Sequence, residues 1–169
     1  MKGNELWREL LTVLEESVTL YKDLLFLGEQ KRQALVEAET VELEAITRRE
    51  ELIILDGTRL EERRAKATAA LATRYNLADN KPTLTMLAAV ADPEMAEQVG
   101  LRGAELDAVV KKLLRLHETN AALISQALTF VNYNLNLLTR SQAETTYVAT
   151  GGRSSAEKSS ASVILDRKI

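Results

Sequence analysis

The chain of 169 residues has no cysteine, two prolines, seven glycines and a single histidine. Without cysteine it can form no disulfide and perform no thiol chemistry, which fits a reducing compartment. A β-sandwich or β-barrel needs a turn signal roughly every 8–12 residues. Because glycine and proline are so scarce, the sequence argues against both of these architectures.

Positive charge is also in short supply. The 22 Lys and Arg residues are outnumbered by 25 Asp and Glu residues, for a net charge of −3. Because binding to phosphates requires a positive excess, no nucleic-acid partner is expected. No stretch approaches 18 consecutive apolar residues, and Glu5 and Glu9 lie where a signal peptide would be apolar. We therefore expect a cytoplasmic protein that does not insert into a membrane.

The chain is instead rich in Leu, Ala, Glu and Arg, which lose little rotamer freedom in a helix. Before residue 37, two adjacent apolar stripes with helical spacing predict one long helix with a wide buried face. The segment "EAET" (37–40) predicts a turn, with Thr40 as the N-cap of the next helix. The two stripes are Leu6, Leu10, Val13, Leu20, Leu24 and Leu27, and Trp7, Leu11, Leu14, Val18, Tyr21 and Leu25.

Two further long helices and a short one are predicted. The second covers about 41–75, and its many oppositely charged pairs indicate a solvated outer face. An irregular segment, 76–93, contains a short apolar helical piece near 84–90. The pair Asp92–Pro93 is a good helix start, so the third long helix should cover 93–140, with a kink or break between Gly100 and Gly103.

The segment "FVNYNLNLL" (130–138) is ambiguous because its apolar residues alternate with asparagines, as in a half-buried strand. The alternation lasts only about seven residues and has no turn signal on either side. A helical stripe with 4,3 spacing continues through it, which favours a helix. Asn120 and Asn134 lie on this stripe, where a polar residue can set the register of packing. The stripe comprises Leu106, Val110, Leu113, His117, Asn120, Ile124, Ala127, Val131, Asn134 and Leu138.

From Ser141 to Ile169 the composition changes to Ser, Thr, Ala and Gly, and no apolar period remains. Such a segment buries too little apolar surface to offset its ordering entropy. We therefore expect a helical body over 1–140 and a flexible tail over 141–169. The tail ends in a small apolar tip, which either docks on a partner or folds back on the body. The tip is formed by Val163, Ile164 and Leu165.

No catalytic constellation is recognisable, since acid–base or metal chemistry needs several converging polar groups. The sequence has no phosphate-binding glycine loop and no serine in a nucleophile turn. We expect neither an enzyme nor a bound cofactor or metal. His117 is expected at the buried face or edge of the third helix. The alternative is that His117 is a phosphotransfer histidine. The sequence after His117 does not contain the small residues and the lysine that usually follow such a histidine.

The chain resembles the FlgN-type flagellar export chaperones over nearly its whole length. The resemblance rests on the order of four degenerate segments. They are "LLTVLEESVTLYKDLLFLGEQKRQALVEAETVELEAITRREELI" (10–53), "NAALISQALTFVNYNLNLL" (120–138), "TTYVATGG" (145–152) and "SVILDRKI" (162–169). The helix pattern already predicts an all-α antiparallel bundle of three long helices and a short one. The resemblance implies that this bundle acts in the cytoplasm as a type III secretion chaperone. The implied clients are hook-associated junction proteins, captured through their C-terminal amphipathic helical region and delivered to the export gate.

Apolar residues of the third helix and of the tail tip are the candidate client-binding residues, because apolar helices are commonly captured by apolar surfaces. They are Leu123, Ala127, Phe130, Leu137, Leu138, Val163, Ile164 and Leu165. By the same resemblance, Tyr147 matches the tyrosine that docks on the export gate. Two alternatives remain: a homodimeric coiled-coil structural or regulatory protein, and a phosphotransfer module that uses His117. For the chaperone itself, a homodimer in the absence of client is left open.

Overall fold

The computed structural model describes residues 2–78 and 82–146 of the chain. Within these ranges the chain forms four helices and no strand. They are α1 (Lys2–Glu37), α2 (Thr40–Arg74), α3 (Leu84–Ala88) and α4 (Pro93–Thr146). The predicted all-α fold is confirmed, as is the helix over 130–138.

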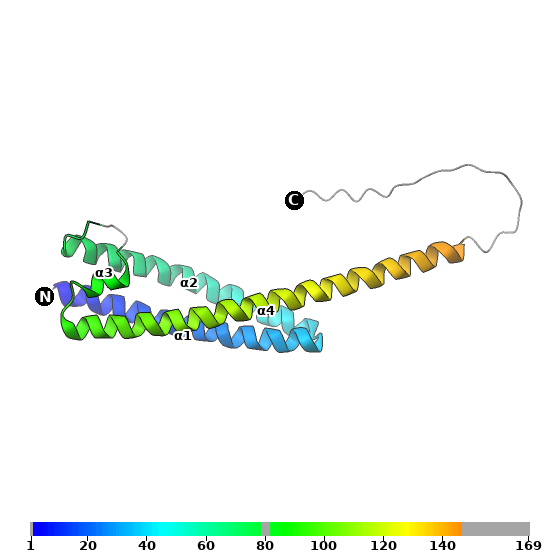
Figure 1. The fold of residues 1–169 in the computed structure, drawn as a ribbon, viewed down its shortest axis with the longest axis horizontal. Coiled ribbons are helices and arrows are strands. Elements are labelled where there is room, and N and C mark those ends of the chain that lie inside the picture. The colour runs from blue at the N-terminus through cyan, green and yellow to red at the C-terminus, as the bar shows by residue number, and fades with distance from the viewer. Residues whose placement is uncertain (1, 79–81, 147–169) are drawn as a thin grey trace, which may run out of the picture. The chain divides into compact units, whose positions relative to one another are not determined.

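The chain divides into two compact units, residues 1–128 and 129–169. In the first unit α1 and α2 form an antiparallel hairpin, and the 93–128 part of α4 runs in the same direction as α1 (Figure 1). Polar contacts between α1 and α4 agree with this direction, since their residue numbers rise together: Glu15 with Arg102, and Gly28 with Asn120. The first unit is therefore an up-down-up bundle of three long helices. In the second unit, α4 covers 129–146.

The main core of the first unit is built by all four helices. Trp7 is 1% exposed, and its indole N–H donates a hydrogen bond of 2.9 Å to the hydroxyl of Tyr75 at the end of α2. Both apolar stripes predicted in the first helix are buried or half-buried, which confirms its wide packing face. The core consists of Trp7, Leu10, Leu14, Ala67, Leu71, Leu87 and Val99, and a smaller cluster at the α1–α2 turn consists of Leu27, Ala34 and Ile46.

Both helices of the hairpin end in a Schellman-type cap. Ala38 follows α1 with φ 58°, and the N–H of Glu39 donates to the carbonyl of Ala34 at 2.9 Å. Asn76 follows α2 with φ 52°, and the N–H of Leu77 donates a hydrogen bond to the carbonyl of Ala72 at 2.9 Å. The left-handed conformation costs little at asparagine but crowds the Cβ of alanine. Ala38 is therefore a strained position in the hairpin.

Replacing Ala38 by glycine is expected to raise the free energy of unfolding by about 0.5–1 kcal/mol, because the strain at φ 58° exceeds the entropy that glycine adds to the unfolded chain. Urea unfolding followed by circular dichroism measures it. Asn76→Gly is the matched control and should change stability by a few tenths of a kcal/mol at most. Equal effects at both positions would contradict this account of the turn.

Two predicted helix starts have different outcomes. The carboxylate of Asp92 accepts a hydrogen bond of 2.9 Å from the N–H of Met95, so the predicted cap at Asp92–Pro93 is confirmed. The predicted cap at Thr40 is wrong by one residue. Glu39 occupies the N-cap without a side-chain hydrogen bond, and Thr40 is the first helical residue. The left-handed Ala38 cap of α1 determines where α2 begins, and the side-chain preference of Thr40 does not.

α4 differs from its prediction at two places. It passes through Gly100 and Gly103 as one helix, so a break there is wrong. A Cβ on Gly103 would come within 3.1 Å of Leu84 Cδ1, which shows that this glycine lets α3 pack closely. α4 also continues to Thr146, whereas the sequence predicted its end near Arg140. Polar residues such as Ser141 end an apolar period without ending a helix.

Candidate partner-binding site

The second unit presents large apolar side chains to solvent. Val131 is 50% exposed, Tyr133 is 61% exposed and Leu135 is 54% exposed. Single exposed leucines need no explanation, but several large exposed apolar residues within nine positions make this part of α4 a candidate interaction surface. We call it the terminal apolar surface, and it consists of Phe130, Val131, Tyr133, Leu135, Leu137 and Leu138.

The same part of α4 carries no ionisable side chain other than Tyr133 between residues 119 and 139. Its polar residues use the helix itself for hydrogen bonds. The side-chain amide of Asn134 donates to the carbonyl of Phe130 at 3.0 Å, and the hydroxyl of Thr139 donates to the carbonyl of Asn136 at 3.1 Å. A partner on this surface therefore meets apolar groups and amides, with no formal charge to orient it.

The structure locates five of the sequence-predicted client residues on α4. Phe130, Leu137 and Leu138 are 68%, 47% and 62% exposed and belong to the terminal apolar surface. Ala127 is exposed and Leu123 is half-buried in the first unit. The remaining predicted site residues lie outside the described residues: Tyr147, Val163, Ile164 and Leu165.

The predicted inner stripe of the third helix is correct only in its first half. Leu106, Val110 and Leu113 are half-buried, and Asn120 is 5% exposed. Beyond Asn120 the stripe is mostly exposed to solvent, so it does not continue as a packing face of the bundle. The residues concerned are Ile124, Ala127, Val131 and Leu138, while Asn134 is half-buried. Val131 was assigned to the stripe alone, and Tyr133 and Leu135 lie outside it, so the sequence reasoning named none of these three exposed residues as a candidate.

The first unit has an apolar groove of about 300 Å³ between α1, α2 and α4. Its rim carries the ion pair of Lys31 Nζ with Glu50 Oε2 at 2.7 Å, which links α1 to α2. His117 is exposed at the groove, so the edge position expected from the sequence is confirmed. This volume is at the small end of ligand pockets. The apolar lining comes from Leu24, Gly28, Ile54, Leu113, Leu114, Leu116, Ala121 and Ile124.

Asn120 lies at the base of the groove. Its side-chain amide donates a hydrogen bond of 2.8 Å to the carbonyl of Gly28. A Cβ on Gly28 would come within 2.8 Å of Leu116 Cδ2, so glycine is what permits this close approach of α1 and α4. The Oδ1 atom of Asn120 is buried and has no hydrogen-bond partner among the described protein residues. Asn120 therefore fixes the register of α4 on α1, as its position on the stripe predicted.

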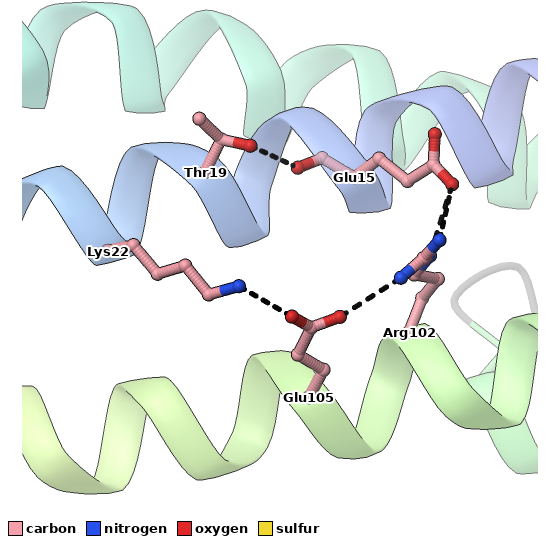
Figure 2. A network of polar contacts seen from close by, with 5 residues as sticks. All are labelled: Glu15, Thr19, Lys22, Arg102 and Glu105. Atoms are coloured by element: carbon pink, nitrogen blue, oxygen red, sulfur yellow. Dashed lines mark hydrogen bonds and ion pairs between the residues drawn. The ribbon is translucent and has the colours of Figure 1, made fainter.

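A polar network on the outer face of the bundle also joins α1 to α4 (Figure 2). The carboxylate of Glu105 accepts hydrogen bonds from Lys22 at 2.6 Å and from Arg102 at 3.1 Å, and Arg102 reaches Glu15 at 3.1 Å. The hydrogen bond from Lys22, followed by that from Arg102, lowers the pKa of Glu105. The hydrogen bond to Glu105 and the charge of Glu15 raise the pKa of Arg102.

The lowered pKa of Glu105 predicts an acid-sensitive contribution to stability. A carboxyl whose folded pKa is depressed stabilises the fold above its unfolded value, about 4.3, and this contribution is lost as the pH falls through the folded pKa. Glu105→Gln should lower the melting temperature slightly at pH 7, with no difference near pH 3 or in high salt. Asp107→Asn, in an exposed pair with Lys111, is the control. An equal loss at pH 3 and pH 7 would refute the electrostatic origin.

The parts of the chain that the structure describes contain no group of three or more His, Cys, Asp or Glu side chains arranged to hold a metal ion. Among the described helices, none is long and apolar enough to cross a membrane. What the described residues do offer is exposed apolar helix surface. The fold thus defines a class of protein: an all-α chain with three long helices, the last of which exposes large apolar side chains to solvent.

The comparisons with known proteins identify the family within this class. The family model described as FlgN protein matches residues 1–155. The chain therefore belongs to the FlgN family and has the general role of a flagellar export chaperone. Searches of curated proteins and of solved structures found no match to the chain.

Proposed function

We propose that this protein captures the C-terminal amphipathic helical region of hook–filament junction proteins in the cytoplasm. In this proposal it prevents their premature assembly and delivers them to the flagellar export gate. The terminal apolar surface carries the proposal, because an amphipathic helix buries its apolar face against such a surface. Membership of the FlgN family supports a flagellar export role, and the junction proteins are the clients that we propose for it.

The alternative is a homodimeric coiled coil in which the same surface serves a second copy. Light scattering coupled to size-exclusion chromatography distinguishes the two. The purified chain should change from a monomer to a one-to-one complex when a junction protein from the same organism is added. A dimer whose mass is unchanged by the junction protein would contradict the proposal. A pull-down from a flagellated host asks independently which proteins co-purify.

Replacing Leu137 and Leu138 by serine should weaken client binding by about 100-fold or more, since each buried leucine contributes roughly 1.5–3 kcal/mol. The melting temperature of the free chain should hardly change, because the two side chains are 47% and 62% exposed. Titration calorimetry and thermal unfolding measure the two effects. The matched control is Leu52→Ser with Leu55→Ser on α2, at 65% and 60% exposure, which should leave affinity intact.

A collapse of the melting temperature in the Leu137 and Leu138 variant would show that these residues are core. Equal loss of affinity in the α2 control would show that exposed apolar area matters and that its position does not.

The tail residues have separate roles in the proposal. Tyr147 docks on the export gate, and the tip of Val163, Ile164 and Leu165 closes over the captured helix. Tyr147→Ala should leave client affinity intact while secretion of junction proteins falls. Triple serine substitution at 163–165 should weaken the client complex. If both variants bind and secrete normally, the tail has neither role.

A phosphotransfer role for His117 remains a second candidate only because the side chain is exposed at the groove. It predicts acid-labile phosphate on His117 and loss of motility in His117→Ala. Normal motility of that variant would dismiss it.

A further inference from the structure

The alternating pattern of 130–138 acquires a different meaning on a helix. Each residue of an α-helix turns the chain by about 100°, so a step of two residues turns it by about 200°. Alternate apolar residues therefore do not form one stripe but fall on two. Val131 and Leu135, four residues apart, share one side of α4, and Tyr133 and Leu137 share another.

The two stripes are well separated around the helix. Leu138 joins the first stripe and Phe130 joins the second, and on an ideal helix the two centres lie about 130° apart. Asn132 and Asn136 occupy the remaining polar side. The two stripes, with Asn134 between them, thus span about 200° of the circumference, whereas a helix that packs on one surface needs an arc of about 100°. One partner helix cannot cover both stripes.

Both stripes are exposed to similar degrees. On the first, Val131 and Leu135 are 50% and 54% exposed, and on the second, Tyr133 and Leu137 are 61% and 47% exposed. Neither stripe is therefore the buried face of the second unit. An uncharged helix with two exposed apolar sides is an aggregation hazard unless both are covered in the working complex.

We propose that this part of α4 inserts between two amphipathic helices of a single captured client chain, one on each stripe. The proposal rests on the chaperone function given above and specifies the form of its client. A second copy of this protein would cover one stripe of each chain and leave the other exposed, because a two-fold interface uses the same patch twice. Two helices of one client cover both, and binding of the first raises the effective concentration of the second.

The charge pattern defines the facing surfaces of the client. Because residues 119–139 carry no formal charge at neutral pH, the client helices present apolar side chains toward α4 with amide or hydroxyl groups at the rim. The affinity should therefore be nearly independent of salt, with less than about a twofold change in Kd between 50 and 500 mM NaCl. A tenfold weakening over that range would contradict a neutral interface.

Three matched double variants of the full chain test the two-sided arrangement. They are Val131→Ser with Leu135→Ser on the first stripe, Tyr133→Ser with Leu137→Ser on the second, and Asn132→Ser with Asn136→Ser on the polar side. Calorimetric titration with a junction protein should show a one-to-one complex and at least about a 100-fold weaker Kd for each apolar variant. The polar-side variant should bind within about threefold of the unaltered chain. Circular dichroism should show equal helicity for all three.

A photo-crosslinking residue placed at Leu135 or at Tyr133 then asks what covers each stripe. The two positions should capture two non-overlapping client segments, identified by mass spectrometry of the crosslinked peptides. The proposal is overturned if one stripe is dispensable, if both positions capture the same segment, or if one captures a second copy or the chain's own tip at 163–165. In those cases the client still binds and the proposed function stands. Absence of any complex with the unaltered chain would refute the proposed function itself.

Discussion

Replacement of Trp7 by alanine is expected to lower the free energy of unfolding by about 3–5 kcal/mol, the cost typical of removing a large aromatic side chain from a packed core. Trp7 is 1% exposed and contacts a core built by all four helices. Its loss also leaves the hydroxyl of Tyr75 without the 2.9 Å hydrogen bond that joins the two ends of the hairpin. Urea unfolding at 25 °C followed by circular dichroism measures the change.

Trp7→Phe is the matched control for this prediction, because it keeps an aromatic ring and removes only the indole N–H with part of the volume. It should cost clearly less than the alanine variant, since Tyr75 is 36% exposed and its hydroxyl can turn to water. If Trp7→Ala costs under about 1 kcal/mol, the ring does not organise this core.

Asn120→Asp is expected to destabilise the bundle by more than about 3 kcal/mol at pH 7, because it places an uncompensated carboxylate at a buried position. Asn120 is 5% exposed, and its amide nitrogen donates to the carbonyl of Gly28 at 2.8 Å. A carboxylate has no donor for that carbonyl and would repel it.

The loss should increase with pH. Burial raises the pKa of the introduced carboxyl in the folded state above its unfolded value of about 3.9. Between these two values the unfolded chain binds fewer protons than the folded one, so stability falls as the pH rises. Asn120→Leu, which also removes an Oδ1 atom that has no hydrogen-bond partner among the described residues, should stay within about 1 kcal/mol of the unaltered chain. A pH-independent loss, or an equal loss in the leucine variant, would contradict the burial of this site.

The long helices could be predicted from the sequence because apolar period, turn residues and caps all agree there. Asp92–Pro93 is the clearest case, since the cap needs only local chemistry. The start of α2 was predicted one residue late because Ala38, an unlikely left-handed residue by type, caps α1. The close approach at Gly28 could not be foreseen either. A lone glycine in a helix indicates a loss of helix stability, but it does not indicate which other helix packs closely against it.

The candidate site was predicted only in part. The apolar richness of α4 was visible in the sequence, and three residues named from it as client-binding candidates, Phe130, Leu137 and Leu138, are exposed. A 4,3 stripe, however, looks the same whether it faces a neighbouring helix or solvent. Val131 and Leu135 were therefore assigned to the interior or passed over. The signal that could have identified them as exposed is the alternation of apolar residues and asparagines itself, because on a helix it places apolar residues on two sides.

Amide hydrogen exchange of the chain with and without a bound junction protein tests the central claim most directly, namely that the exposed apolar surface of α4 captures the client. Peptides covering 129–139 should show the largest gain in protection on binding, because a covered helix opens less often than a solvated one. Peptides from the middle of α2, which exposes Leu52 and Leu55, should change little. Unchanged exchange over 129–139, with protection gained on α2 instead, would contradict the account.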